Sequence, residues 1–128
     1  PPVMSALAPQ ADLAPPPPLD AASTLVEQWG AVEDAARVLA MLAGRPTPVH
    51  DVHAEARIGL LAAVQCTRSD PAIFALGELV ATMRAGLDAL LAAHGTSANP
   101  QAAAIRLWNE YERGRAQVLS EAAKALAC

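Results

Sequence analysis

The sequence predicts an all-α fold: an antiparallel up-down-up-down four-helix bundle over residues 19–128, behind a disordered or extended proline-rich arm over residues 1–18. Two observations predict it. Apolar residues recur at alternating steps of three and four, the spacing of a helix that buries one face. Much of the apolar 53% is alanine, the strongest helix former, whereas aromatic residues make up only 3%. A chain of 128 residues is long enough for one ordinary domain.

The arm is predicted from its prolines, which include Pro1, Pro2, Pro9 and a run at 15–18. Proline has no backbone N–H and a fixed φ, so such a segment is neither helix nor central strand. Polyproline II is its natural conformation. We expect a semi-rigid linker, with a tether or docking strand as the alternative.

The first helix is predicted over about 20–43, closed by Gly44, and the second over about 48–66, capped by Thr47 with Pro48 at its first position. The seam of the first helix is formed by residues three or four apart: Leu25, Trp29, Val32, Ala36, Leu39 and Ala43.

The third helix is predicted to start at Ser69, with Pro71 in its first turn, and to end at Gly95. The fourth opens at Asn99 and Pro100 by the same logic. Short loops make sequential helices antiparallel neighbours, which gives the up-down-up-down order. A helical hairpin pair that completes its core only as a dimer is the rival architecture.

The three histidines form the candidate metal site. In that topology His50 and His53 begin the second helix at the end of the bundle where the third helix reaches His94. Residues three apart share a helix face, and three imidazoles are a ligand set that zinc accepts. The alternative is that the helix dipole favours His94 while His50 and His53 are exposed polar residues. No cofactor is expected; zinc or another divalent metal at the histidines is the alternative, and elemental analysis tests it.

Charge and hydropathy exclude two classes of partner. A net charge of −4 and a pI of about 5.2 argue against a protein that grips nucleic acid through its overall field. No apolar run reaches the length of a membrane span. The expected partner is a protein or a second copy of this chain.

The cysteines and the first residues bear on the compartment. Cys66 and Cys128 fit neither a disulfide framework nor a zinc pattern, so two free thiols in a reducing compartment, the cytoplasm, are expected. The chain starts at Pro1 without an initiator Met, so we expect a fragment or processed product, from which any targeting segment would be missing.

Rare residues within the helices indicate packing more than chemistry. Trp29 and Trp108 are expected to fill the core. Glu33 is one of several acids on the first helix, and we expect the slightly basic fourth helix, which carries Arg115, to neutralise them. Five glycines inside helices favour close helix contact, with room for a ligand or a kink as the alternative.

No catalytic constellation is present, so no catalytic residue is assigned. The sequence lacks a glycine-rich phosphate loop, a Gly-x-Ser-x-Gly elbow and the Glu-x-x-His pairs of di-iron bundles. The leading hypothesis is a non-catalytic interaction or assembly module, an adaptor or accessory subunit. The alternative is a ligand- or metal-sensing bundle that uses the histidine end. A third is an all-helical enzyme that binds an anionic substrate through Arg84, Arg106, Arg113 or Arg115.

Overall fold

The structure is a computed structural model that describes residues 18–49, 51–64, 69–93 and 99–127. Within these residues there are four α-helices and no strand, which confirms the all-α class. The helices are α2 (Pro18–Ala43), α3 (Val52–Val64), α4 (Asp70–Ala92) and α5 (Pro100–Leu126). The predicted arm lies outside the described residues, apart from Pro18, which begins α2.

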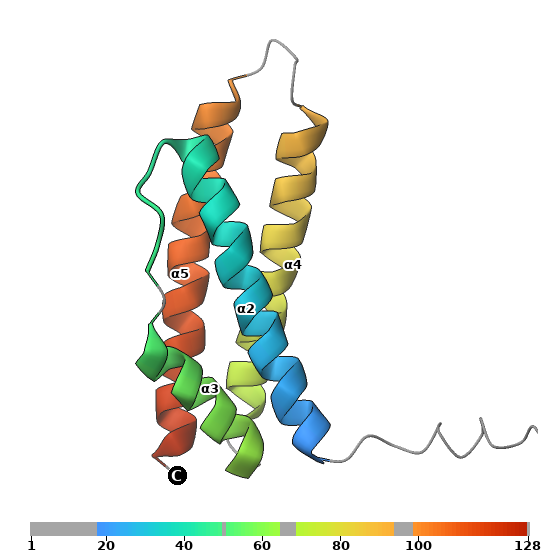
Figure 1. The fold of residues 1–128 in the computed structure, drawn as a ribbon, viewed down its shortest axis with the longest axis vertical. Coiled ribbons are helices and arrows are strands. Elements are labelled where there is room, and N and C mark those ends of the chain that lie inside the picture. The colour runs from blue at the N-terminus through green and yellow to red at the C-terminus, as the bar shows by residue number, and fades with distance from the viewer. Residues whose placement is uncertain (1–17, 50, 65–68, 94–98, 128) are drawn as a thin grey trace, which may run out of the picture.

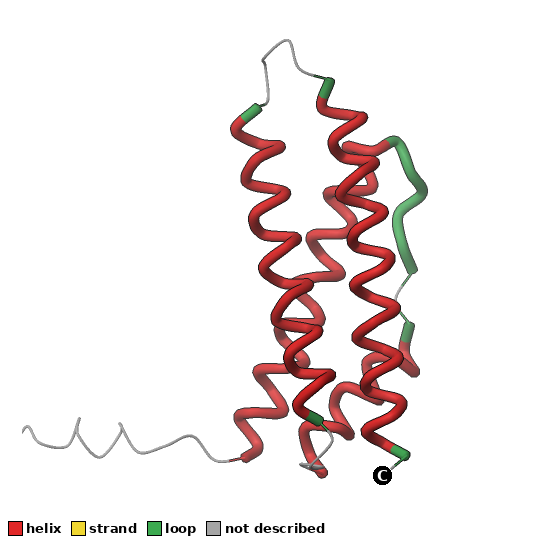
Figure 2. Tube along the Cα trace, turned by 180° about the vertical axis from the view of Figure 1, so that it is seen from behind, coloured by secondary structure: helices red, strands yellow, loops and turns green. Residues whose placement is uncertain are grey.

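Three long helices form the body of the molecule, and one short helix lies across it (Figure 1). Helices α2 and α4 run in the same direction and α5 runs in the opposite one; all three pack on one another. The view from behind shows the same arrangement (Figure 2). In the described part of the chain, α3 packs against α2 and α5 but not against α4. The structure therefore confirms four helices but not the predicted arrangement, in which each helix touches the next along the chain.

The second helix departs most from its prediction, because it begins at Val52 and not at Pro48. Gly44 has φ +69°, and the N–H of Arg45 bonds the carbonyl of Ala40 at 2.8 Å, so α2 ends as predicted, in a Schellman motif. The chain then runs back in extended form beside α5 before α3 starts (Figures 1 and 2).

Asp51 sets the new start, because its Oδ1 accepts the Ala54 N–H at 3.1 Å. Aspartate caps a helix at least as well as threonine, and only one of two nearby caps can begin the helix. The predicted cap at Thr47 was therefore wrong. The predicted end at Cys66 lies outside the described residues.

The starts of the last two helices agree with their predicted signals. Asn99 caps α5 by accepting the N–H groups of Gln101 and Ala102 through its side chain. Helix α4 begins at Asp70 with Pro71 in its first turn, although the hydroxyl of Ser69 makes no capping bond.

The core lies between the three long helices and the inner face of α3. Trp29 and Trp108 are both buried, as predicted. The largest fully buried side chains come from all four helices: Trp29, Leu39, Ile58, Leu61, Leu76, Met83, Val32 and Val118.

Two of the helical glycines are sites of close packing. A Cβ at Gly86 would lie 2.5 Å from Leu107 Cδ2, and one at Gly114 would lie 2.6 Å from Leu79 Cδ1. Both contacts join α4 to α5, so close helix approach is confirmed at these positions. By contrast, a Cβ at Gly77 would meet nothing within 4 Å, so that part of α4 faces open space.

Candidate functional site

The residues of the predicted metal site are mostly outside the described chain. His53 is exposed near the start of α3, whereas His50 and His94 are not described, and neither are Cys66 and Cys128. Among the described residues, no group of three His, Cys, Asp or Glu side chains is placed to hold a metal. Helix α4 ends at the top of Figure 1 and α3 begins in its lower part, so the described ends of these helices are not neighbours. The zinc hypothesis stays a prediction.

The most distinctive polar feature is a buried carboxylate on α2. Glu33 lies among the core residues of that helix and is only 3% exposed, although its side chain is a carboxylate. Its Oε1 accepts the Tyr111 hydroxyl at 2.9 Å and the Arg115 Nε at 3.2 Å, both from α5. A buried charge is tolerated when it is paired and hydrogen-bonded, and Glu33 meets both conditions.

Arg115 extends this arrangement to the start of α3. Its Nη2 lies 3.9 Å from Asp51 Oδ2, and its guanidinium sits 5.3 Å from the centre of the Trp29 ring, within cation–π range. We call Glu33, Tyr111, Arg115 and Asp51 the polar cluster. The cluster joins α2, α5 and the N-terminus of α3.

The environment of the cluster changes the acidity of two members. Burial raises the pKa of the Tyr111 phenol, and the hydrogen bond and negative charge of Glu33 raise it further. The N–H of Ala54 lowers the pKa of Asp51 below its ordinary 3.8, and the positive charge of Arg115 acts in the same direction. Tyr111 is therefore a neutral donor and Asp51 a charged acceptor near neutral pH, which are structural roles.

A hollow of about 330 Å³ opens beside the polar cluster. Trp108, Tyr111, Glu112 and Arg115 of α5 line one side, and Pro48, Val49 and Asp51 line another. Each residue of the cluster already has a partner inside the protein. Among the described residues that line the hollow, no buried side-chain polar atom lacks a hydrogen-bond partner, so none of these atoms defines a ligand.

The sequence predicted part of this cluster. The expected neutralisation between the first and last helices is confirmed by the Glu33–Arg115 pair. Tyr111 and Asp51 were missed. A signal was present for Tyr111, which lies four residues before Arg115 and so one turn along the same helix face.

The second feature is an apolar groove between α2 and α4, with a volume of about 290 Å³. Leu91, which lines the groove, is 62% exposed. Val38 (47% exposed), Leu42 and Ile73 do not line the groove, but each lies seven residues from a lining residue (Ala31, Ala35 and Val80, respectively) and so near it around the helix. We call this surface the α2/α4 face; it comprises Ala31, Ala35, Val38 and Leu42 of α2, and Ile73, Val80, Arg84, Leu87, Asp88 and Leu91 of α4.

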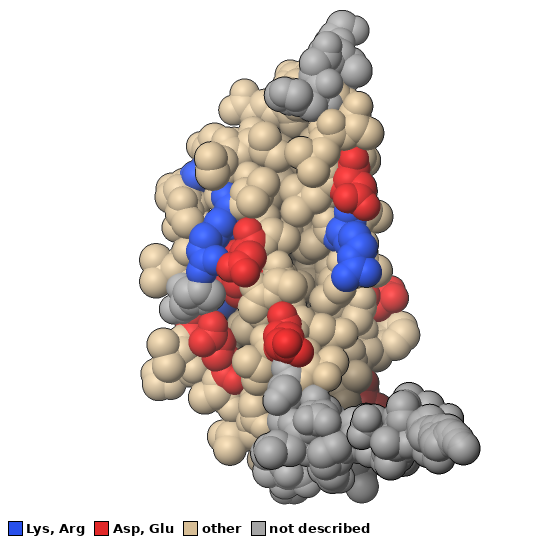
Figure 3. Space-filling model, turned by 45° about the vertical axis from the view of Figure 1, so that its right-hand side comes forward, with Lys and Arg blue, Asp and Glu red and all other residues tan. Residues whose placement is uncertain are grey.

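The residues of the α2/α4 face follow a helical-bundle spacing. On α2 the face repeats at 31, 35, 38 and 42, and on α4 at 80, 84, 87 and 91, the four-three-four steps by which bundle helices contact a neighbour. Figure 3 shows a strip of uncharged surface in this region with acidic and basic side chains on either side. The pattern is that of a helix pair that lacks one neighbour.

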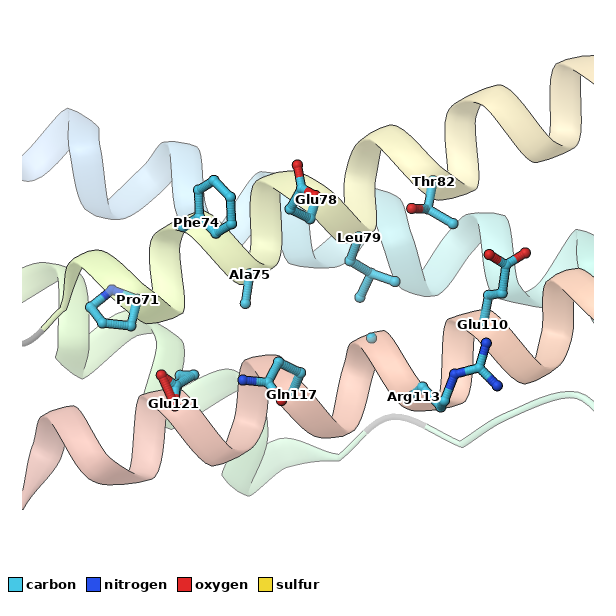
Figure 4. A pocket seen from close by; sticks show the side chains of 11 residues that line it. Pro71, Phe74, Ala75, Glu78, Leu79, Thr82, Glu110, Arg113, Gln117 and Glu121 are labelled. Atoms are coloured by element: carbon cyan, nitrogen blue, oxygen red, sulfur yellow. The ribbon is translucent and has the colours of Figure 1, made fainter.

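A third concavity lies between α4 and α5, with a volume of about 540 Å³ (Figure 4). Ala75 and Leu79 of α4 point toward α5 and form its apolar floor. Glu78, Arg113 and Glu121 are among the residues that line it, so this groove is bordered by charge.

The four arginines proposed for an anionic substrate do not converge. Arg84 belongs to the α2/α4 face and Arg115 to the polar cluster. Arg106 and Arg113 line two different hollows of the α4/α5 groove. No shared site for one anion results from this arrangement.

Comparison with protein-family models, with curated proteins and with solved structures gave no match. Among the described residues, no helix combines the length and the apolar character that crossing a membrane requires.

Proposed function

We propose that this chain is a non-catalytic interaction module that binds a helical surface of a protein through the α2/α4 face. The observation that carries the proposal is the exposure of large apolar side chains at bundle spacing along two adjacent helices, with Val38 and Leu91 the clearest examples. Covering side chains of this kind with a partner is favourable by about 25 cal/mol for each Å² of apolar surface removed from water.

The shape of the groove supports a helix as the bound element. Helices α2 and α4 run in the same direction and form two rims, and an amphipathic helix can lay its apolar face into such a groove. Small residues at Ala31 and Ala35 leave space on the α2 side for the side chains of an incoming helix.

The other two grooves of the long-helix trio are less suited to this role. Helix α3 packs on both α2 and α5, so it already covers part of the groove between those two helices. The α4/α5 groove is lined by several charged side chains, among them Glu78 and Arg113, which would have to be desolvated. The α2/α4 groove has four polar lining side chains fewer, because Arg84 and Asp88 are the only polar ones among its described lining residues.

Site-specific photocrosslinking in cells tests the proposal. A benzoylphenylalanine at position 38 or 91 should form a discrete adduct with a protein, because both side chains lie on the face. Positions 41 and 74 are matched controls, since Met41 and Phe74 are exposed apolar residues of the same two helices that neither line the groove nor lie seven residues from a lining residue, as Val38 does from Ala31.

The substitution Ala31→Glu provides the second arm, because it places a charge on the exposed rim of the groove. It should abolish the adducts at 38 and 91 while circular dichroism shows unchanged helicity. Adducts of equal strength at the control positions, or none at positions 38 and 91, would contradict the proposed interface.

A further inference from the structure

We propose that the partner covering the α2/α4 face is a second copy of this chain, docked in antiparallel orientation with α4 against α4. This inference rests on the proposed function, because it names the occupant of the same face. It comes from the positions of Arg84 and Asp88, the two charged residues that line the groove.

Arg84 and Asp88 are self-complementary about a two-fold axis. They are both exposed and lie one turn apart on α4. When two copies of α4 cross antiparallel with the axis near residue 86, Arg84 of one copy faces Asp88 of the other, and the reverse pair forms by symmetry. An isologous interface requires a patch of this kind, in which one surface supplies both halves of each contact.

The charges of Arg84 and Asp88 have no opposite charge within ion-pair distance among the residues that the structure describes. Their order along the helix, with the base before the acid, is the weaker orientation for a pair within one helix. A pair between two copies does not have this restriction.

The same axis matches large side chains with small ones. It places Leu91, 62% exposed, opposite Ala81 of the second copy, and Val80 opposite Ala92 of the second copy. Ala81 and Ala92 are exposed, and Gly77 on the same side of α4 faces open space. Small residues let two helices approach closely, so the protruding leucine has room.

The size of the face sets the expected strength. Two adjacent helices of about 35 Å length, with axes 8–10 Å apart, present on the order of 600 Å² per copy. That area is smaller than the roughly 800 Å² per partner of stable interfaces, so the dimer should be weak and reversible. The association must therefore be measured up to millimolar concentration.

A charge-swap series followed by sedimentation equilibrium tests the inference. Arg84→Asp sets like charges opposite each other at both symmetric pairs, and so does Asp88→Arg. Each single variant should raise the dimer dissociation constant about tenfold or more. The double variant R84D/D88R should restore dimerisation, and an equimolar mixture of the two single variants should form a heterodimer. Arg106→Asp, an exposed change on α5 outside the face, should leave the association unchanged.

Two outcomes would overturn the inference. One is a wild-type chain that remains monomeric at millimolar concentration; the groove adducts of the crosslinking experiment would then identify a different protein, and the proposed function would stand. The other is a dimer that the single charge reversals do not weaken, because its interface would lie elsewhere.

Discussion

Removal of one hydroxyl from the polar cluster should have a measurable cost. Tyr111→Phe deletes the donor that lies 2.9 Å from Glu33 Oε1 and leaves the ring in place. Both residues are buried, so water does not replace the lost hydrogen bond. The carboxylate keeps only the Arg115 Nε at 3.2 Å.

The magnitude follows from the charge of the acceptor. A hydrogen bond to a charged group contributes about 1.5–3 kcal/mol, more than one between neutral groups. We therefore expect Tyr111→Phe to lower the free energy of unfolding by about 2 kcal/mol. With an unfolding entropy of about 2.1 cal/mol/K per residue over roughly 110 residues, the Tm should fall by about 9 °C.

Urea unfolding followed by circular dichroism measures this loss, and a double-mutant cycle assigns it to the Glu33 contact. In a Glu33→Leu background the Tyr111 hydroxyl has no carboxylate to bind, so Tyr111→Phe should cost about nothing. Arg115 is 22% exposed and lies near Asp51, so it tolerates the loss of Glu33 better than a buried base would. An equal loss in both backgrounds would show that the hydroxyl acts through something other than Glu33.

Three further predictions concern acidity and packing. Because the pKa of Asp51 is lowered in the folded state, its charge stabilises the fold above pH 3.8, and this contribution is lost as the pH falls through the folded pKa. Asp51→Asn keeps the capping oxygen but not the charge, so the difference in urea midpoint between wild type and this variant should shrink in acid. Tyr111 is the sole tyrosine, and its raised pKa means that the folded state holds the phenol proton more tightly. Tyrosinate absorbance should therefore stay absent past pH 10.0 until the chain unfolds, with Tyr111→Phe as the blank. Ionisation near pH 10.0 without unfolding would contradict the buried contact. Gly86→Ala should destabilise the fold by about 1–2 kcal/mol because the added Cβ meets Leu107. Gly77→Ala, with open space around it, should stabilise the fold by up to about 1 kcal/mol. Thermal unfolding at low protein concentration would refute this if both variants changed the stability in the same direction.

Local signals in the sequence were sufficient for most of the helices. The glycine after α2 and the Asn99–Pro100 pair before α5 act through the backbone of their own turn, so their meaning does not depend on the rest of the fold. Thr47 failed for a different reason. Asp51 offers an equivalent cap four residues later and also contacts Arg115 of α5, a long-range interaction that no local pattern contains.

The candidate site was predictable to a lesser extent for the same reason. An acid such as Glu33 on the apolar side of a helix indicates a buried partner, and the charge balance identified α5 as its source. The position of Tyr111 on the same helix face as Arg115 would have completed the pair of donors. The exposed α2/α4 groove could not be predicted. The sequence indicated a second helix over about 48–66 that packs as one of four equivalent members of a bundle, and such a bundle leaves no pair of helices without a neighbour.

The polar cluster and the exposed face have a common structural origin. Asp51 holds the start of α3 near Arg115, and Arg115 is bound to Glu33 on the side of α2 that faces α5. The chain between α2 and α3 uses its length to run back beside α5, which leaves α3 short and on that side. In consequence α3 does not reach α4, and the rims that carry Val38 and Leu91 stay accessible. A weakened cluster, as in Arg115→Met, should therefore loosen α3 before it alters the α2/α4 face. Amide hydrogen exchange in this variant should become faster in α3 than in the wild type, and an equal increase along the α2/α4 face would argue against this separation.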